Sequence, residues 1–273
     1  MYQKPNKRLE GQTAIITGSS SGIGAAVAKS IAKDGANVVI NYHSGKEEAE
    51  EVANEICEDG ICGNAIIVKA DVSKEADVKK MFKAAVDKFG TVDICVANAG
   101  IQKDAALHEM SLKDWQLVID INLTGQFLCA KEAIIEFFRR GMRPEVSSAI
   151  GKIIHMSSVH EIIPWAGHAN YAASKGALIM LMKSITQEYA ARKVRCNSIA
   201  PGAIKTDINK DAWATAEALD KLNDLIPYER IGVPSDIGSA AAWLASDESD
   251  YINGTTIFVD GGMSCYPGFT SNG

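Results

Sequence analysis

The 273-residue sequence predicts an α/β protein with a doubly wound parallel sheet of about seven strands and helices on both faces. Three observations lead to this fold class. Short runs rich in Val and Ile alternate with longer amphipathic runs along the chain. The short runs are apolar at consecutive positions, as in strands that are buried on both faces. A glycine-rich turn joins the first short run to the first long one.

The expected elements follow these runs in chain order. Strands are predicted at 13–18, 36–42, 64–70, 92–100, 151–158, 193–202 and 255–262. Helices are predicted at 22–34, 44–60, 73–90, 111–140, 170–190, 213–225 and 235–246. Consecutive strand–helix–strand units with right-handed crossovers give the Rossmann-type arrangement.

No linker, low-complexity block or repeat divides the chain, so one domain is expected. Residues 1–10 are predicted to form a polar N-terminal arm, and residues 11–273 the domain itself. The segment 139–151 is the least regular internal stretch and is expected to be a surface loop.

Composition limits the classes of function. The formal net charge of −6 argues against nucleic acid or an anionic membrane as the main partner, because both attract excess Lys and Arg. No apolar run approaches the roughly 18 residues that span a bilayer, and the polar start lacks the apolar core of a signal peptide. The six cysteines form no Cys-x-x-Cys pair, so free thiols and a cytoplasmic location are expected. No metal site is expected.

The turn TGSSSGIG at 17–24 is a candidate phosphate-binding loop. Gly18, Gly22 and Gly24 allow a tight turn and close approach of a ligand, and the helix start that follows offers free N–H groups. The spacing is G-x-x-x-G-x-G, which differs from the usual dinucleotide pattern G-x-G-x-x-G. A plain turn is the alternative, but the position after the first strand favours dinucleotide binding.

The end of the second strand is expected to influence the choice of cofactor. An acidic residue there would bind the ribose 2′-hydroxyl of NAD and repel the 2′-phosphate of NADP. Asn41, Tyr42, His43 and Ser44 carry no negative charge, and Lys46 follows them. We therefore expect NADP to be accepted and NAD as well. Exposed loop residues without influence on the cofactor are the alternative.

Tyr171 and Lys175 are the candidate catalytic pair. Residues four apart share one face of a helix. A tyrosine with a pKa of about 10 is a weak base at neutral pH, and a neighbouring ammonium lowers that pKa. Such a pair could take a proton from an alcohol. Most Tyr–Lys pairs are solvated surface pairs, but Ser157 and Ser158 end the fifth strand, at the sheet edge where ligands bind.

Several motifs together resemble the short-chain dehydrogenase/reductase family along almost the whole chain. They are TGSSSGIG, ADVS (70–73), NAG (98–100), NLTG (122–125), SS (157–158), YAASK (171–175) and PG (201–202). The resemblance implies a catalytic set of Asn122, Ser158, Tyr171 and Lys175. Tyr171 would exchange the proton, Ser158 would hold the substrate oxygen, and Lys175 would lower the Tyr171 pKa and bind the nicotinamide ribose. Asn122 would support a proton relay.

The resemblance also implies that the domain binds the dinucleotide as well as catalysing the reaction. The cofactor contacts that it implies are Gly18, Ser20, Gly22, Ile23, Gly24, Asn41, Tyr42, His43, Asp71, Val72, Asn98, Ala99, Gly100, Tyr171, Lys175, Pro201, Gly202, Ile204 and Thr206. Without the resemblance, Asp71 would be interpreted as an acidic residue at the start of a helix, where interaction with the helix dipole would stabilise the helix by about 0.5 kcal/mol.

Longer stretches resemble the bacterial NAD(P)-dependent glucose 1-dehydrogenases. They are HEMSLKDWQLVIDINLTG, MSSVHEIIPWAGHANYAASKGA, PGAIKTDIN and DGGMSCYPGF. The implied reaction oxidises β-D-glucose at the anomeric carbon: Tyr171 takes the hydroxyl proton, hydride passes to C4 of the nicotinamide, and D-glucono-1,5-lactone leaves. The substrate contacts expected are Ser158, His160, Glu161 and Tyr171, with Gln102 and Asn209 as further polar candidates and Trp165 as a ring contact or loop support.

Two features depart from the pattern, and other functions stay open. The loop at 139–151 is longer than the resemblance implies, and His43 stands where NADP-accepting relatives often carry Arg. A family member acting on a polyol, a steroid or a ketoacyl substrate is the first alternative. A dinucleotide-sensing or scaffold protein is the second, and an intact catalytic set argues against it. The C-terminal segment suggests a homotetramer, with apolar area from Phe258, Met263, Tyr266 and Phe269.

Overall fold

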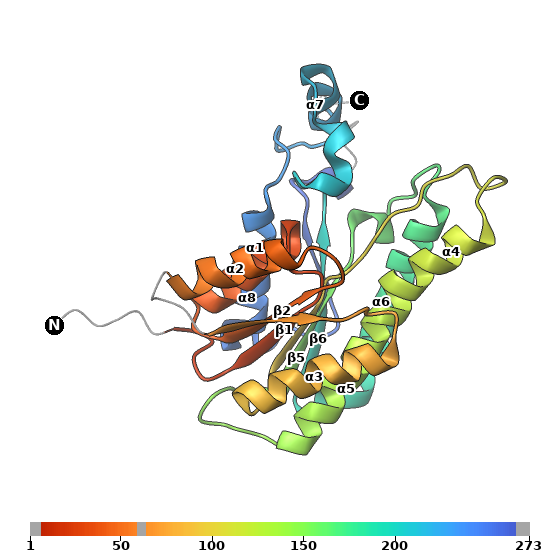
Figure 1. The fold of residues 1–273 in the computed structure, drawn as a ribbon. Coiled ribbons are helices and arrows are strands. Elements are labelled where there is room, and N and C mark those ends of the chain that lie inside the picture. Colours follow the sequence, from red (N-terminus) through yellow and green to blue (C-terminus); the bar gives the residue numbers. More distant parts are fainter. Residues whose placement is uncertain (1–6, 59–63, 266–273) are drawn as a thin grey trace.

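The computed structural model describes residues 7–58 and 64–265, and within them a seven-stranded parallel sheet forms the centre of the molecule (Figure 1). The strand order is β3-β2-β1-β4-β5-β6-β7. This confirms the predicted fold class. The strands are β1 (Thr13–Ile16), β2 (Asn37–Tyr42), β3 (Ala65–Lys69), β4 (Ile94–Ala97), β5 (Gly151–Met156), β6 (Val194–Pro201) and β7 (Thr256–Val259).

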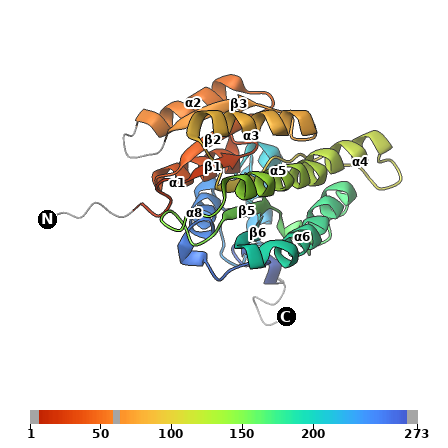
Figure 2. The same ribbon diagram turned by 90° about the horizontal axis from the view of Figure 1, so that it is seen from below.

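Helices cover both faces of the sheet, as the view from below shows (Figure 2). One layer contains α1 (Gly22–Lys33), α2 (Lys46–Glu58) and α8 (Pro234–Ala245). The other layer contains α3 (Glu75–Phe89), α5 (Gly125–Arg140) and α6 (Ala169–Tyr189). The two remaining helices are α4 (Leu112–Ile119), which packs on α6, and α7 (Ala216–Asn223), which projects beyond the sheet in Figure 1.

Two buried apolar clusters lie one on each face of the sheet, and alternate strand residues supply them. In β1, Ile16 belongs to the cluster beneath α1 and α8, whereas Ile15 belongs to the cluster beneath α3 and α5. Strands buried on both faces need apolar residues at consecutive positions, which explains the continuous apolar runs of the sequence.

The strand order reverses direction between β1 and β4, so the loops that follow these two strands diverge. In open α/β sheets this switch point leaves a crevice at the carboxyl ends of the strands. The glycine-rich turn follows β1 and the NAG motif follows β4, so both motifs lie at that crevice.

The long helical stretch expected at 111–140 is confirmed, with a change of helix type inside it. A five-residue π-helical turn, Asp120–Thr124, separates α4 from α5, and the Gly125 N–H donates to the Asp120 carbonyl. The helix expected at 213–225 is the shorter α7, preceded by a 3₁₀ segment at Asp207–Ala212. The last two residues of the helix expected at 44–60, one of the six cysteines (Cys62), and the apolar residues Tyr266 and Phe269 lie outside the described residues.

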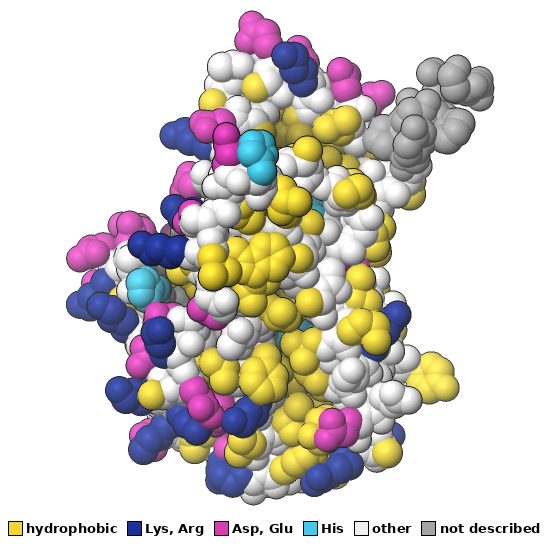
Figure 3. All heavy atoms as spheres, turned by 90° about the vertical axis from the view of Figure 1, so that its right-hand side faces the viewer, with side chains coloured by type: hydrophobic (Ala, Val, Ile, Leu, Met, Phe, Trp, Pro, Cys, Tyr) yellow, Lys and Arg dark blue, Asp and Glu magenta, His cyan; other side chains and the backbone are white. Residues whose placement is uncertain are grey.

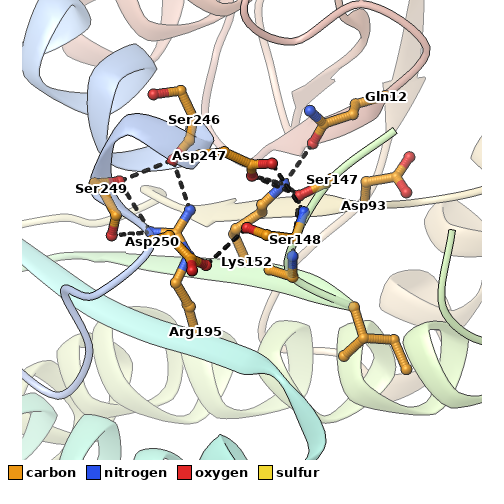
Figure 4. A network of polar contacts seen from close by, with 12 residues as sticks. Gln12, Asp93, Ser147, Ser148, Lys152, Arg195, Ser246, Asp247, Ser249 and Asp250 are labelled. Atoms are coloured by element: carbon orange, nitrogen blue, oxygen red, sulfur yellow. Dashed lines mark hydrogen bonds and ion pairs between the residues drawn. The ribbon is translucent and has the colours of Figure 1, made fainter. Parts of the chain in front are cut away.

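The amino edge of the sheet, opposite the crevice, is closed by a polar network (Figure 4). The Lys152 ammonium on β5 donates to Gln12 Oε1 at 2.7 Å and to Ser147 Oγ at 2.5 Å, and it lies 3.6 Å from Asp247 Oδ1. The loop expected to lie on the surface at 139–151 is therefore partly buried, because Ser147 and the Ser148 N–H both bind Asp247.

Among the described helices, none is both long enough and apolar enough to cross a membrane. Within the same residues, no group of three or more His, Cys, Asp or Glu side chains could hold a metal ion. The described cysteines, Cys57, Cys95, Cys129, Cys196 and Cys265, are free thiols.

Candidate active site

The glycine-rich turn after β1 forms a cradle that side chains would fill. Gly18 and Gly22 have φ angles of +60° and +55°, which L-residues with side chains rarely adopt. A Cβ atom on Gly24 would lie 2.2 Å from the Gly18 carbonyl oxygen. Ser21, the residue before α1, is extended and its side chain does not cap the helix. The first N–H groups of α1 are thus available to an anion.

Two asparagine amides brace this turn from beneath. Asn41 Oδ1 accepts from the Gly18 N–H at 3.0 Å, and Asn41 Nδ2 donates to the Ala70 carbonyl at 3.1 Å. Asn98 Nδ2 donates to the carbonyls of Thr17 at 2.8 Å and Gly18 at 3.1 Å. Both side chains were expected to contact the cofactor directly. Both line the cavity, and these amide hydrogen bonds also shape the glycine-rich turn.

A cavity of about 1040 Å³ opens at the carboxyl edge of the sheet. Every residue expected to contact the cofactor lines it, including Asp71 and Val72 after β3 and Thr206 after β6. Asp71 Oδ1 accepts from the Ser73 N–H at 3.0 Å and from its hydroxyl at 2.7 Å. Burial raises the pKa of this carboxyl, but the two Ser73 hydrogen bonds outweigh it and hold the pKa below its usual value.

Asn122 lies in the π-helical turn rather than on the cavity wall. Its amide binds both backbone groups of Ile101, with Oδ1 accepting from N–H at 2.8 Å and Nδ2 donating to the carbonyl at 2.9 Å. Nδ2 also reaches Ser174 Oγ at 3.3 Å. Asn122 is fully buried, so its side chain ties α6 to the segment after β4. π-Turns are frequent at functional sites because they expose backbone groups that an α-helix would pair.

Tyr171, Lys175 and Ser158 meet on the cavity wall, as the sequence predicts. Tyr171 and Lys175 occupy successive turns at the start of α6, and Ser158 follows β5. The Lys175 ammonium donates to the Met156 carbonyl at 2.7 Å and lies 5.5 Å from the centre of the Tyr171 ring. The side chains of Ser158 and Gln102 lie near the phenol and act to lower its pKa.

The expected lowering of the Tyr171 pKa by Lys175 is wrong for this geometry. Burial raises the Tyr171 pKa, and the nearby Ser158 and Gln102 side chains offset only part of that effect. The ammonium donates to Met156 rather than to the phenol. Burial in turn lowers the Lys175 pKa to about 8, against a smaller opposing effect of Glu161.

Only some of the residues expected to bind a sugar line the cavity. Glu161 does not line it, and its carboxyl lies toward Ser157 and Thr256 instead. Burial raises the Glu161 pKa, and those two side chains lower it by a smaller amount. Asn209 lines the cavity but its Oδ1 accepts from Thr206 N–H at 3.2 Å. The direct sugar contact expected of Glu161 is therefore not supported.

His160 and Trp165 form part of a ring stack at the mouth of the site. The Trp165 ring lies 4.4 Å from that of His160 and 3.5 Å from that of His168, nearly parallel to both. His160 Nδ1 is paired with the Ile163 carbonyl at 3.0 Å. Nothing in the sequence beyond the aromatic residues themselves indicated this stack, since stacking depends on how the loop folds back.

Apolar residues on the opposite wall were not expected from the sequence. The wall comes from the 3₁₀ segment and α7, and it includes Ile208, Leu222 and Leu225. Ile208 is 66% exposed and Leu225 50% exposed. The amphipathic pattern at 213–225 was the available signal, because such a helix must place its apolar face against something.

The residues of this cavity fit a nicotinamide dinucleotide. One side of the cavity carries the glycine cradle, the free N–H groups of α1 and Asp71. Lys175 lies farther along the cavity, and its ammonium donates to the Met156 carbonyl. An amino-terminal helix end for phosphates and an acid for the adenosine end are the features that dinucleotide sites use.

Comparison with known proteins agrees with this geometry. A family model described as enoyl-(acyl carrier protein) reductase matches residues 18–264. The chain is 49% identical over 261 residues to 3β-hydroxysteroid dehydrogenase 1 of Eggerthella lenta. The aligned region covers 96% of this chain and 97% of that protein. It is 43% identical over 262 residues to glucose 1-dehydrogenase 2 of Bacillus subtilis, with coverage of 96% and 98%.

A solved structure shares the fold closely. The gluconate 5-dehydrogenase of Burkholderia cenocepacia, in complex with NADP and tartrate, superposes with a TM-score of 0.86 at 35% identity, covering 96% of this chain and 98% of that one. The resemblance first read from the motifs thus extends over the whole domain, and the chain belongs to the short-chain dehydrogenase/reductase family.

Proposed function

We propose that the chain is an NAD(P)-dependent dehydrogenase that interconverts a secondary alcohol and a ketone, with Tyr171 as the proton-transferring residue. The observation that carries this proposal is the meeting of the Tyr171 phenol, the Ser158 hydroxyl and the Lys175 ammonium on the wall of the glycine-cradled cavity. A protein that only sensed dinucleotides would need the cradle but none of these three groups.

Each chain residue has a separate task in this proposal. Ser158 holds the substrate oxygen beside the phenol, because its side chain lines the same cavity wall and influences the Tyr171 pKa. Tyr171 takes the proton from an alcohol or gives it to a ketone. Lys175 supplies positive charge near the phenolate that forms. Asn122 holds α6 against the segment after β4. When bound, the nicotinamide accepts or supplies the hydride.

We propose a bulky, apolar alcohol, such as a 3β-hydroxysteroid, as the substrate class. The cavity beyond Tyr171 is lined mainly by apolar side chains, namely Ile163, Pro164, Trp165, Ile208, Leu222, Leu225 and Met263. Trp165 is 42% exposed, and contact with an apolar ligand would remove its surface from water. The 49% identity to a 3β-hydroxysteroid dehydrogenase supports the same class.

β-D-Glucose, with D-glucono-1,5-lactone as the product, is the second candidate. It is supported by the 43% identity to a glucose 1-dehydrogenase and by His160, which lines the cavity. A sugar needs several polar groups that converge on its hydroxyls. Glu161 is turned away and Asn209 is engaged with Thr206, so this wall offers fewer free polar groups than a sugar site requires.

We propose that both NADP and NAD are accepted. The end of β2 presents Tyr42, His43 and Ser44 to the cavity, none of which carries a negative charge that would repel a 2′-phosphate. Several solved relatives, including the gluconate 5-dehydrogenase, hold NADP. Near this position, the basic side chains that line the cavity are His43 and Lys74. No other basic side chain in this part of the lining would make binding depend on a 2′-phosphate.

We also propose a cytoplasmic homotetramer. Large apolar side chains are exposed on the face that carries α4 and α6, where Figure 3 shows a broad hydrophobic area. They include Leu112 on α4, Phe127 and Ile135 on α5, and Met180 on α6. Apolar areas of this kind usually mark contacts between proteins. Sedimentation velocity would measure the assembly, and a monomer at all concentrations would contradict it.

The first test compares substrates and one variant. Purified protein is mixed with NAD or NADP and either a 3β-hydroxysteroid or β-D-glucose, and formation of reduced nicotinamide is followed by absorbance. We expect faster turnover of the steroid, and the reverse ranking would favour the sugar. Tyr171→Phe should lower kcat by at least about 10³-fold with NADPH affinity nearly unchanged. Full activity in this variant would remove Tyr171 from the mechanism.

A further inference from the structure

The indole of Trp165 is held between two histidine rings in the loop that joins β5 to α6. Its centroid lies 4.4 Å from that of His160 and 3.5 Å from that of His168, with interplanar angles of 20° and 6°. Two flat rings at these distances would overlap on one indole face, so they lie on opposite faces. Trp165 is still partly exposed and lines the cavity, so the part of the indole that remains for a ligand is its edge.

His168 has a hydrogen-bond acceptor at each ring nitrogen. Nδ1 lies 3.0 Å from the Ala166 carbonyl oxygen, and Nε2 lies 3.2 Å from Asp104 Oδ2. Carbonyl and carboxylate oxygens only accept, so the ring donates to both when it is the imidazolium, which carries two N–H groups. The His168 side chain is 13% exposed, so water competes little for these contacts. The protonated ring also places a cation against the face of Trp165, which attracts it.

The segment after β4 reinforces the position of this loop with two further hydrogen bonds. The Ala105 N–H donates to the Gly167 carbonyl at 3.0 Å, and Asn170 Nδ2 donates to the Lys103 carbonyl at 2.8 Å. Asn170 is fully buried. These two bonds fix the course of the loop, but they do not involve the indole, so the orientation of the indole depends on the rings that cover its faces.

We propose that His168, together with Asp104, is a positioning residue that fixes the Trp165 edge in the substrate cavity and thereby sets the preference for a bulky apolar ring substrate. The inference rests on the proposed function. His168 and Asp104 are not among the residues that line the cavity, so they act through Trp165. A side chain that is already held in one orientation loses little conformational entropy when a ligand binds, which strengthens the binding of a rigid ring system. Without His168, the indole could occupy other rotamers and would contact the ligand for only part of the time.

The charges around the stack decide which substitution tests it. Burial lowers the His160 pKa, the Ile163 carbonyl opposes this effect, and a charge on His168 lowers the pKa further, so His160 is the neutral ring of the stack. Burial raises the Tyr171 pKa, and the Asp104 carboxylate adds a smaller increase. A change at Asp104 would therefore also act on Tyr171, whereas a change at His168 keeps the carboxylate in place.

The first measurement needs no substrate. Trp165 is one of four tryptophans, so its emission is obtained as the difference between each protein and the same protein carrying Trp165→Phe. His168→Leu uncovers one indole face, and we expect the acrylamide quenching constant of Trp165 to rise at least about twofold. His168→Phe keeps a ring that can stack but lacks both N–H groups, so it should raise this constant by a smaller factor.

The second measurement uses a 3β-hydroxysteroid as the substrate. His168→Leu should raise KM for the steroid about three- to tenfold, which is the size of one aromatic stacking contact, while kcat and the KM for NADP change by less than about twofold. His168→Phe should raise the steroid KM by a smaller factor. Asp104→Asn combined with His168→Leu should raise the steroid KM little further, because the two side chains act as a pair.

The chain offers a matched control in a second histidine that lies beside a carboxylate. His108 Nε2 is 3.8 Å from Glu109 Oε1, but the His108 side chain is 83% exposed and does not line the cavity. His108→Leu therefore removes the same chemical group from the same face of the protein without touching Trp165. It should leave both the quenching constant and the steroid KM unchanged.

The outcomes separate the alternatives. A rise in both quenching and steroid KM in the His168 variants, with neither in His108→Leu, supports the positioning role. Unchanged quenching of Trp165 in folded His168→Leu would overturn it, as would a rise in quenching with an unchanged steroid KM. Failure of both His168 variants to fold, while His108→Leu folds, would show that His168 serves the fold alone and would also overturn it. A wild-type protein that oxidises no steroid contradicts the proposed substrate class, yet the quenching result still decides whether His168 holds Trp165.

Discussion

Two buried lysines at opposite edges of the sheet differ in how their charge is used. Lys175 at the carboxyl edge is 3% exposed and Lys152 at the amino edge is 1% exposed. Burial lowers the pKa of each to about 8. Both ammonium groups have therefore lost much of their hydration, and each needs compensation from the protein.

The compensation is nearly complete at one edge and incomplete at the other. Lys152 is surrounded by Gln12, Ser147 and Asp247, which match the three N–H groups of an ammonium (Figure 4). Within the described part of the chain, Lys175 has one hydrogen bond, to Met156, and otherwise faces the cavity and the Tyr171 ring. A buried ammonium with unused donors at a cavity wall therefore indicates a ligand site, whereas one with all its donors bonded indicates a structural role.

The largest expected effect separates the two lysines by activity. Lys175→Met should lower kcat by about 10³-fold, because the phenolate of Tyr171 loses its neighbouring cation. Lys152→Met should keep activity within about threefold, since its network lies at the far edge of the sheet. Steady-state rates and NADPH fluorescence titration of both variants measure this. Equal losses would mean that the Lys152 network also governs the active site.

The next effect concerns stability and reverses the ranking. Lys152→Ala leaves Gln12, Ser147 and Asp247 without their shared partner, so it should lower the free energy of unfolding by about 3–5 kcal/mol. Urea unfolding measures the change. The exposed Lys113→Ala is the control and should alter stability by less than about 0.5 kcal/mol. A loss below about 1 kcal/mol for Lys152→Ala would show that water replaces the lysine without cost.

A smaller effect follows from the lowered pKa of Lys152. Its pKa is about 8 in the folded protein and 10.5 as its reference value, so the unfolded chain binds more protons between these pH values. The cost of burying the charge is fully present below about pH 8 and is relieved as pH rises to 10.5. The stability difference, wild type minus Lys152→Met, should thus increase by up to about 3 kcal/mol across this window. A flat difference would place the folded pKa near 10.5.

The smallest expected effect changes cofactor choice without touching either lysine. His43→Arg places a permanent cation beside the cavity at the end of β2. It should raise the ratio of kcat/KM for NADP over NAD by about tenfold, because guanidinium groups bind phosphate in a bidentate manner. His43→Gln serves as the uncharged control. The same ratio in both variants would mean that this position does not contact the 2′-phosphate.

Much of the fold was predictable from local patterns. Consecutive apolar residues such as Ile15 and Ile16 indicate strands buried on both faces, and the alternation with amphipathic runs indicates the parallel sheet. The helical spacing of Tyr171 and Lys175 put both groups on one face of α6. These features depend on short-range periodicity, which a sequence records directly.

Most residues that line the cavity were also predictable as a set, because motifs in order along the chain identify the family. Their individual directions were not. Asn41 and Glu161 were expected to contact ligands, yet Asn41 braces the glycine turn and Glu161 lies toward Ser157 and Thr256. A side chain's direction depends on partners from distant segments, and no local pattern contains those partners.

Periodicity, glycine spacing and motif order lie along the chain, so the sequence alone is enough to predict the sheet, the glycine-rich turn and the polar groups of the cavity wall. The different surroundings of two buried lysines with similar pKa values depend on the folded structure. Lys152 meets Gln12 and Asp247 from segments far apart in sequence, while Lys175 shares the Met156 oxygen with Gln126. Desolvation and hydrogen-bond saturation arise from three-dimensional packing, so they appear only once the chain is folded.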